Sequence, residues 1–336
     1  MPAQATVFIP NFNGGRYIKR ALESLAAQTY SDFAVLVIDD GSTDNSLEIA
    51  ETFTDILPNL RILRFENSGI AAAWNRAFDL VETPYLTLLH CDDEYHPDYI
   101  AKMSSLMDAH PQAAIGHCAA LAMDQQSKVL DSPMEVFKFN SFFKNAPAVR
   151  EPIEDYKLLL KGCFINCPSV IYRTESAKQV GLFNPHYKTT LDWEYWFRVL
   201  FLGFSIASTP EQLFFYRRHG ENESQKTSEN LSRFHEEHDV IQWAHGQGQQ
   251  LGWLPEDVQP DYGLLNQTMT FAIANDLLRN SRKAAGEKHQ LLRMLNPRVR
   301  HRPLNIGLYV FRAMGPLGGW LLNRAILTAV RLAKYW

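Results

Sequence analysis

Hydrophobic and polar residues follow two different periods in the first 120 residues of the chain. Short runs of branched and aromatic residues favour β-strands, and between them apolar residues recur at the spacing of three and four that favours helices. Strands that alternate with helices of this length are typical of parallel βαβ units, which predicts a doubly wound sheet. The expected strands are 6–10, 34–38, 61–65 and 85–89, and the expected helices are 17–28 and 70–81.

A further helix is expected between the second and third strands. Ser42, Thr43 and Asp44 precede it, and such side chains accept hydrogen bonds from the first free amides of a helix. This cluster predicts that the helix begins there.

The pattern changes after residue 112, where the elements become less regular. From about Ser228 onward the chain has a helical pattern, with breaks at prolines such as Pro255 and Pro260. We therefore expect one Rossmann-like α/β domain with a mostly parallel central sheet at 1–227, in two halves (1–112 and 113–227), and a helical C-terminal extension at 228–336. In the second half, the expected strands are 113–123, 128–131 (paired with the first), 169–173 and 212–217, and the expected helices are 153–160 and 191–202.

The composition is that of a globular protein with a substantial core. The chain has 336 residues, of which 46% are hydrophobic and 12% aromatic. Its four cysteines are too few and too scattered for a disulfide framework, which favours a reducing compartment. The sequence shows no signal-peptide pattern and no apolar run of about 18 residues, so a cytoplasmic protein is expected.

Charge is distributed unevenly along the chain. Residues 279–336 carry twelve Lys or Arg and one acid, a net +11, so the preceding residues carry −15 within the overall −4. The segment 320–336 resembles a basic amphipathic helix on an anionic membrane surface, which would make the protein peripheral on the inner face of the cell membrane. The alternative is a helix packed on the catalytic domain or on a second subunit in a homo-oligomer. No nucleic-acid-binding motif is present, so no nucleic acid is expected as a partner.

Carboxylates follow two of the expected parallel strands. Asp39 and Asp40 come directly after the second strand, and Asp92 and Asp93 follow the fourth. Ligands of open α/β sheets bind at the carboxyl ends of the strands, so these acids are expected at one edge. Acids cannot crowd together without a counter-charge, and hard oxygen ligands suit Mg²⁺ or Mn²⁺. The sequence therefore predicts a divalent metal site at this edge.

With these segments in place, the chain resembles the family-two glycosyltransferases, which are inverting enzymes with the A-type nucleotide-diphospho-sugar transferase fold. The resemblance covers roughly residues 5–224 and leaves the helical remainder outside it. Its matching segments are 7–13 (VFIPNFN), 22–30 (LESLAAQTY), 37–44 (VIDDGSTD), 67–69 with Asn75, 85–93, 192–198 (DWEYWFR) and 216–219 (YRRH).

The resemblance implies a nucleotide-sugar donor, a glycan or lipid-linked acceptor, and a role for each matching residue. Asp192 would be the catalytic base, and Asp92, with His219, would hold Mn²⁺ or Mg²⁺. Asp40 would accept a hydrogen bond from a pyrimidine, which leaves UDP- and dTDP-sugars open as donors. The residues expected to bind the nucleotide sugar are Pro10, Asn11, Phe12, Asp40, Gly69, Asn75, His90, Cys91 and Arg217.

Two positions depart from the family pattern. His90 stands where the family's metal motif usually starts with an acid, and Trp74 replaces a common arginine. Without the family match, Asp192 would be interpreted as the N-cap of the helix at 191–202.

Three other functions compete with glycosyl transfer. A catalytically silent nucleotide-sugar-binding protein is suggested by His90. A nucleotidyltransferase would need a Gly-rich basic loop after the first strand, where only Arg16 is basic. A nicotinamide-dependent oxidoreductase would need a Gly-x-Gly-x-x-Gly turn, which follows none of the strands.

Overall fold

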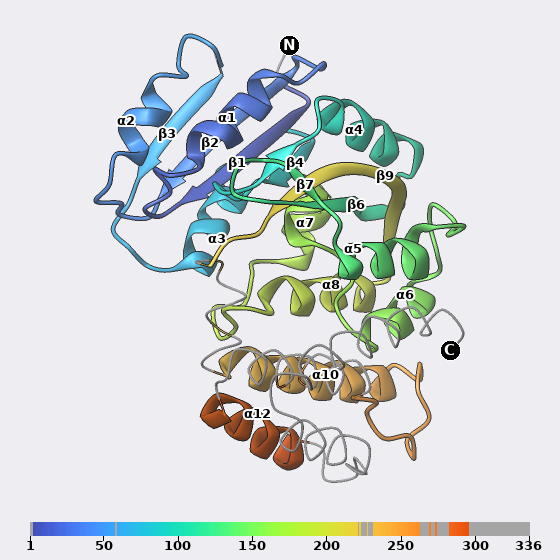
Figure 1. Ribbon diagram of the computed structural model, residues 1–336. Coiled ribbons are helices and arrows are strands. Elements are labelled where there is room, and N and C mark those ends of the chain that lie inside the picture. Colours follow the sequence, from blue (N-terminus) through green and yellow to red (C-terminus); the bar gives the residue numbers. More distant parts are fainter. Residues whose placement is uncertain are drawn as a thin grey trace. The chain divides into compact units, whose positions relative to one another are not determined.

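The computed structural model describes residues 3–57, 59–220, 222, 227, 231–262, 269, 273 and 282–295 (Figure 1). The chain divides into two compact units, Met1–Asn222 and Glu223–Trp336. The first unit is an α/β domain, and the described part of the second is largely helical, with α10 (Ser232–Gln250) and α12 (Arg282–Leu295). The predicted α/β fold class and the helical region after it are confirmed. The predicted amphipathic segment 320–336 lies outside the described residues.

One nine-stranded sheet organises the first unit, in the order β3-β2-β1-β4-β8-β6-β9-β5 with β7 paired to β6. Its first four strands are parallel to one another. Most of β1, β2 and β4 is buried, as expected for strands covered on both faces. These strands are β3 (Leu60–Arg64), β2 (Phe33–Asp39), β1 (Ala5–Asn11) and β4 (Tyr85–Leu88).

Helices connect the parallel strands and close the βαβ units. They are α1 (Ile18–Ala26), α2 (Ser46–Glu51) and α3 (Ile70–Leu80). In α1 the buried Ile18, Leu22 and Leu25 form one apolar stripe, which explains the helical spacing read in the sequence. Because all four strands run the same way, their carboxyl ends, and the loops that follow, lie at one edge of the sheet.

The remaining strands join the sheet in mixed directions. β6 (Ala113–Met123) lies between β8 (Val170–Arg173), to which it is antiparallel, and the long β9 (Ser205–Arg217), to which it is parallel. The short β7 (Val129–Leu130) pairs with the end of β6, as predicted. The short β5 (Glu94–Tyr95) pairs with β9 directly after the loop that follows β4. This pairing brings the end of β9 beside the acidic loop after β4.

Helices cover the second half of the sheet, and an aromatic core joins them to it. Phe78 of α3 packs edge-on against Tyr172 of β8 and Phe183, with ring centroids 5.1 and 5.0 Å apart. Phe183 in turn stacks on Tyr195 of α8, at 4.5 Å, which fixes the start of that helix. The segments are α4 (Tyr99–Ala109), α5 (Pro133–Lys138), the π-helical η1 (Phe139–Phe143), α6 (Pro152–Leu159), the 3₁₀ turn η2 (Cys167–Ser169), α7 (Thr174–Val180) and α8 (Leu191–Phe201).

The second helix starts just after the predicted cluster of Ser42, Thr43 and Asp44. The helix α2 begins at Ser46, with Asn45 at its N-cap. Ser42 Oγ instead accepts a hydrogen bond from the amide of Asn13 at 2.9 Å, and Asp44 Oδ2 accepts one from the amide of Gly15 at 2.8 Å. Asp44 Oδ1 also accepts a hydrogen bond from the amide of Ser46 at 3.1 Å, as the sequence predicts. Asp44 therefore supports the start of α2 and, like Ser42, ties the loop after β1 to the loop after β2.

Among the described residues, no helix combines the length and the apolar character that crossing a bilayer requires.

Candidate active site

The loops after β1 and β2 lie at the edge of the sheet where the parallel strands have their carboxyl ends. Asn11 is buried, and its Nδ2 lies 2.7 Å from Asp39 Oδ1 and 2.8 Å from Ser46 Oγ. Asn11 therefore braces the two loops from within. Phe12, the next residue, is 54% exposed, so its ring is free to contact a ligand.

Asp40 occupies a polar pocket made by the loop before α3. Its carboxylate accepts hydrogen bonds from the amides of Ser68 and Gly69, at 3.0 and 2.8 Å, and from Arg76 Nη1 at 3.1 Å. Gly69 has a φ of 88°, a conformation that favours glycine, and this turn aims its amide at Asp40. Asp40 is thus held in place by the Gly69 turn.

An acidic cluster with one histidine follows β4. One ligand atom from each of His90, Asp92 and Asp93 lies within 4.8 Å of the others. Asp93 is fully buried, and burial together with the charge of Asp92 raises its pKa to about 6. Burial would lower the pKa of His90, but Asp93, Asp92 and Asp192 outweigh it and raise this pKa. The two acids and the imidazole therefore form one electrostatic unit.

The loop after β9 completes this cluster. His219 Nε2 lies 2.9 Å from Asp92 Oδ2, and the ring of His219 stacks on Tyr17 with centroids 4.8 Å apart. Asn222 Nδ2 approaches Asp92 Oδ2 at 3.3 Å, while Asn222 Oδ1 accepts a hydrogen bond from the amide of His219 at 2.7 Å. The hydrogen bond from His219 lowers the pKa of Asp92 although burial acts in the opposite direction.

The donor atoms of this cluster fit a divalent cation. Adjacent ligands of a six-coordinate ion with bonds of about 2.1 Å are roughly 3 Å apart. Asp92 Oδ2 and His219 Nε2 have that separation, at 2.9 Å. The carboxylate oxygen suits Mg²⁺ or Mn²⁺, whereas the imidazole nitrogen is a ligand that later transition metals such as Zn²⁺ prefer.

The side chain of Arg217 is fully buried and contacts the acidic loop after β4 from the interior of the protein. Its guanidinium donates to the carbonyl oxygens of Asp92 and Asp124, at 2.7 and 2.9 Å, and to Glu94 Oε1. Its backbone amide donates to Asp93 Oδ1 at 2.8 Å. The guanidinium therefore makes its contacts within the protein, whereas the family resemblance implies that Arg217 binds the nucleotide sugar.

Asp192 lies in the first turn of α8 and is half-buried. The N-cap of this helix is Thr190, so the alternative interpretation of Asp192 as the cap is wrong. Asp192 is close enough to His90 for its charge to raise the histidine's pKa. The same charge raises the pKa of the buried Cys167, after the larger effect of burial. These effects indicate that Asp192 lies in the neighbourhood of the cluster that follows β4.

The other residues singled out in the sequence lie around this edge. Pro10 is in β1, and Cys91 Sγ is packed so closely against Gly14 that a Cβ there would lie 2.8 Å from it. Asn75 is bonded to the backbone of Phe183, donating at 3.0 Å and accepting at 2.8 Å. Two supporting residues were not foreseen as part of the site: Tyr17 and Asn222. Asn222 alone gives a sequence signal, a polar residue three positions after His219.

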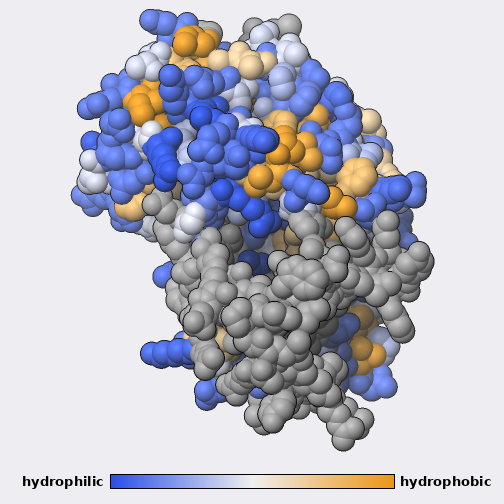
Figure 2. Space-filling model, in the orientation of Figure 1, coloured by the Kyte–Doolittle hydropathy of each residue, from blue (hydrophilic) through white to orange (hydrophobic). Residues whose placement is uncertain are grey.

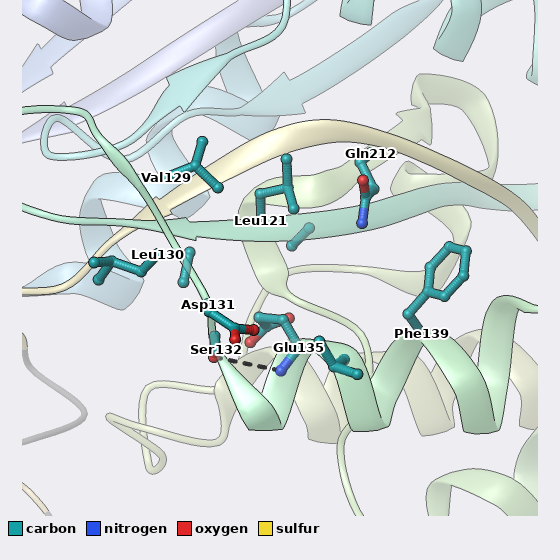
Figure 3. Close-up of a pocket in the computed structure, with 11 residues that line it drawn as sticks. Leu121, Val129, Leu130, Asp131, Ser132, Glu135, Phe139 and Gln212 are labelled. Carbon is teal, nitrogen blue, oxygen red and sulfur yellow. Dashed lines mark hydrogen bonds between the residues drawn. The ribbon is translucent and has the colours of Figure 1, made fainter.

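A cavity of about 360 Å³ lies between β6, β7 and α5 (Figure 3). Its walls are mainly apolar, and hydrophobic side chains gather on the surface over β7 (Figure 2). The labelled lining residues are Leu121, Val129, Leu130, Asp131, Ser132, Glu135, Phe139 and Gln212. The register pairs Ala122 with Tyr216 and Met123 with Arg217, so this cavity adjoins the strand that ends in the His219 loop.

Comparison with known proteins places this site in a family. The profile described as Glycosyl transferase family 2 matches residues 6–181, more than half of the chain. An uncharacterised glycosyltransferase of Rickettsia prowazekii is 27% identical over 244 residues, 70% of this chain and 69% of the relative. One of Rickettsia typhi is 28% identical over 204 residues, and the matched part spans only 58% of each chain.

Solved structures share the fold at low sequence identity. Staphylococcus aureus TarS 1–349, in complex with UDP-GlcNAc, has a TM-score of 0.59 and 19% identity, covering 85% of this chain and 78% of TarS. The mannosyltransferase PcManGT of Pyrobaculum calidifontis, in complex with GDP-Man and Mn²⁺, has a TM-score of 0.55 and 15% identity, covering 100% and 88%. The fold and the family that the sequence predicted are both confirmed. The chain belongs to glycosyl transferase family 2.

Proposed function

We propose that this protein transfers a sugar from a nucleotide diphosphate to a hydroxyl of a glycan or lipid-linked acceptor, with inversion at the anomeric carbon. Synthesis of bacterial surface polysaccharide is the process that this reaction would serve. One observation carries the proposal: Asp92 is paired with His219 at 2.9 Å, at the edge of the sheet where the parallel strands end. Asp192, in the first turn of α8, would supply the base to this edge.

The donor would lie along the carboxyl edge, with its base between Pro10, Phe12 and Asp40. The exposed ring of Phe12 supports stacking on a base. Asp40, whose carboxylate is held by the amides of Ser68 and Gly69 and by Arg76, would accept a further hydrogen bond from a uracil or thymine N–H. UDP- and dTDP-sugars are therefore the proposed donors. Binding of UDP-GlcNAc by TarS and of GDP-Man by PcManGT supports a nucleotide sugar as the donor class.

Asp92 and His219 would hold the divalent cation, Mn²⁺ or Mg²⁺. When bound, the cation supplies positive charge to the diphosphate as it leaves. The chain prepares the site for it, because Arg217 and Asn222 fix the Asp92 loop and the His219 loop. The Mn²⁺ in PcManGT supports a metal of this kind.

Asp192 would act as the general base. As the acceptor hydroxyl attacks the anomeric carbon, its proton passes to the Asp192 carboxylate, while the bond from that carbon to the diphosphate oxygen breaks. Direct displacement with one base inverts the anomeric centre. Asp192 lies in the first turn of α8, at the end of the helix where a negative charge interacts favourably with the helix dipole.

The acceptor would enter from the side of β7 and α5. The cavity there combines apolar walls with Asp131, Glu135 and Gln212, so it suits a ligand with both apolar and polar parts (Figure 3). This character supports a lipid-linked or glycan acceptor. An anionic membrane surface is the proposed partner of the basic C-terminal segment, and a homo-oligomer is the alternative.

A panel of nucleotide sugars tests the proposal. Wild-type protein should release nucleoside diphosphate from one or more UDP- or dTDP-sugars with Mn²⁺ or Mg²⁺ and lose this activity in EDTA. Asp192→Asn should abolish transfer to an acceptor but keep donor binding, while Asp92→Asn should weaken metal-dependent donor binding. Asp79→Asn, which changes an exposed acid of α3, is the matched control and should keep full activity. Unchanged transfer in Asp192→Asn would remove this residue from the mechanism.

His90, in place of the usual acid, favours a second candidate, a catalytically silent nucleotide-sugar-binding protein. This candidate predicts calorimetric binding of a nucleotide diphosphate without donor hydrolysis or transfer under any metal. Hydrolysis that depends on Asp92 would exclude it.

A further inference from the structure

The turn between β6 and β7 contains a residue in an unfavourable backbone conformation. Ser127 has a φ of 66°, in the left-handed region that residues with a side chain seldom adopt. Its amide donates to the carbonyl oxygen of Asp124 at 3.1 Å, and the amide of Asp124 donates to the carbonyl oxygen of Lys128 at 2.9 Å. In hairpins with a three-residue loop, glycine is the usual residue at the left-handed position. Serine therefore occupies this position at a conformational cost.

The hydroxyl of Ser127 uses its full hydrogen-bonding capacity. It donates to Glu94 Oε1 and accepts from Arg20 Nη1 and, at 3.1 Å, from Arg217 Nη2. A hydroxyl has one proton and two lone pairs, so these three contacts satisfy it completely. Glycine would adopt the same backbone conformation without strain, but it would make none of these contacts. The contacts of the hydroxyl therefore account for a serine at this position.

Two of the three partners hold the acidic loop after β4. The fully buried Arg217 donates from its guanidinium to the carbonyl oxygen of Asp92 at 2.7 Å, and from its amide to Asp93 Oδ1 at 2.8 Å. Glu94 follows this loop directly, in β5, and its carboxylate also accepts from Arg217. The turn between β6 and β7 is thus linked to the acidic loop through the hydroxyl of Ser127.

We propose that Ser127 is a positioning residue for the metal site. By fixing the guanidinium of Arg217 and the carboxylate of Glu94, its hydroxyl sets the arrangement in which Asp92 meets His219. A guanidinium is a rigid planar fork, so losing one acceptor changes the orientation that best satisfies the others. The strand β7, which continues from this turn, lines the cavity on the proposed acceptor side, so one hairpin contacts both parts of the site. This inference rests on the proposed function, because it concerns the cation that Asp92 and His219 would hold.

Two variants separate the hydroxyl from the backbone strain. Ser127→Gly and Ser127→Ala both lose the hydroxyl, but only glycine relieves the left-handed conformation, so Ser127→Gly should melt at a higher temperature than Ser127→Ala. Metal binding should be weakened equally in both, since both lack the same contacts. If Ser127 were merely structural, the affinity for metal would instead follow the melting temperature.

Mn²⁺ is the probe, measured as the free ion by electron paramagnetic resonance in the presence of UDP, dTDP or GDP. Replacing a group that holds a metal ligand directly weakens metal binding by about 10- to 100-fold. Ser127 acts one step further from the metal, so the apparent Kd for Mn²⁺ should rise by about 3- to 10-fold in both variants.

A conservative variant and a matched control accompany these measurements. Ser127→Thr keeps a hydroxyl and should retain the wild-type affinity for Mn²⁺, although it should melt at a lower temperature because a β-branched residue is strained at this φ. Asn145 is exposed and has a φ of 67°, so Asn145→Gly makes the same backbone change away from the cluster and should leave Mn²⁺ binding unchanged.

The outcomes distinguish the inference from the proposed function. Wild-type affinity for Mn²⁺ in Ser127→Gly would overturn the inference and leave the proposed function standing, whether or not Ser127→Ala is impaired. A wild-type protein that binds no Mn²⁺ with any of these nucleotides would overturn the metal site of the proposed function, and the inference with it.

Discussion

Replacing Arg217 by lysine tests whether this residue supports the site from within or binds the donor. The side chain is fully buried and donates to two carbonyl oxygens, of Asp92 and Asp124, and to Ser127 Oγ and Glu94 Oε1. A lysine ammonium keeps the charge but cannot reach this spread of acceptors from one atom. Losing about three hydrogen bonds at roughly 1 kcal/mol each gives a cost of about 3 kcal/mol.

The assay is thermal unfolding together with donor titration. For a unit of this size, about 3 kcal/mol corresponds to a fall in melting temperature of roughly 6–12 °C. Arg218→Lys is the matched control, because Arg218 is exposed and its replacement should cost less than about 0.5 kcal/mol. The reasoning is refuted if Arg217→Lys melts like the wild type and only binds the donor more weakly. That outcome would mean that the guanidinium contacts the nucleotide sugar, as the family resemblance implies.

Three further changes probe separate parts of the unit. Phe12→Ala should leave stability within about 0.5 kcal/mol, because the ring is 54% exposed, but should weaken nucleotide binding in calorimetry; unchanged affinity would remove Phe12 from the base pocket. Asn222→Ala removes the group that holds both His219 and Asp92, so half-maximal activity should need about 10-fold more Mn²⁺, and an unchanged requirement would contradict this role. Burial lowers the pKa of His117 to about 3, so the unfolded chain takes up a proton below pH 6.5 that the folded one does not. Stability should therefore fall by about 2 kcal/mol between pH 7 and pH 5 through this residue. Measured by urea titration, the free energy of unfolding of His117→Leu should fall by about 2 kcal/mol less than that of the wild type between pH 7 and pH 5. An equal fall in both proteins would contradict the assignment of this pH dependence to His117.

The sequence allowed the parallel half of the sheet to be predicted almost completely. The strands β1, β2 and β4 are continuous apolar runs because both of their faces are covered, and such runs have no competing pattern. The helix α4 was not predicted, although Ile100, Met103 and Met107 lie on its buried face. Two polar serines, Ser104 and Ser105, interrupt its apolar pattern, and this weakened the periodic signal.

The candidate site was predictable where residues follow strands and unpredictable where contacts are tertiary. Asp92 and His219 were identified through the family resemblance, and the fold brings them to 2.9 Å. The supporting roles of Asn222 and Tyr17 could not be foreseen, since they depend on how the loop after β9 returns to the start of α1. The internal contacts of Arg217 also depend on the sheet register, which the local pattern does not encode.

The Asp92–His219 pair joins positions 127 residues apart in the chain. Closing so long a segment is entropically unfavourable until the intervening strands and helices have formed and β9 has paired with β6. A folding intermediate that contains only the parallel half would have Asp92 at the edge of its sheet, but His219 would not yet lie beside it. If Asp92 and His219 hold a cation as proposed, its binding favours the completed unit over partly folded forms by mass action.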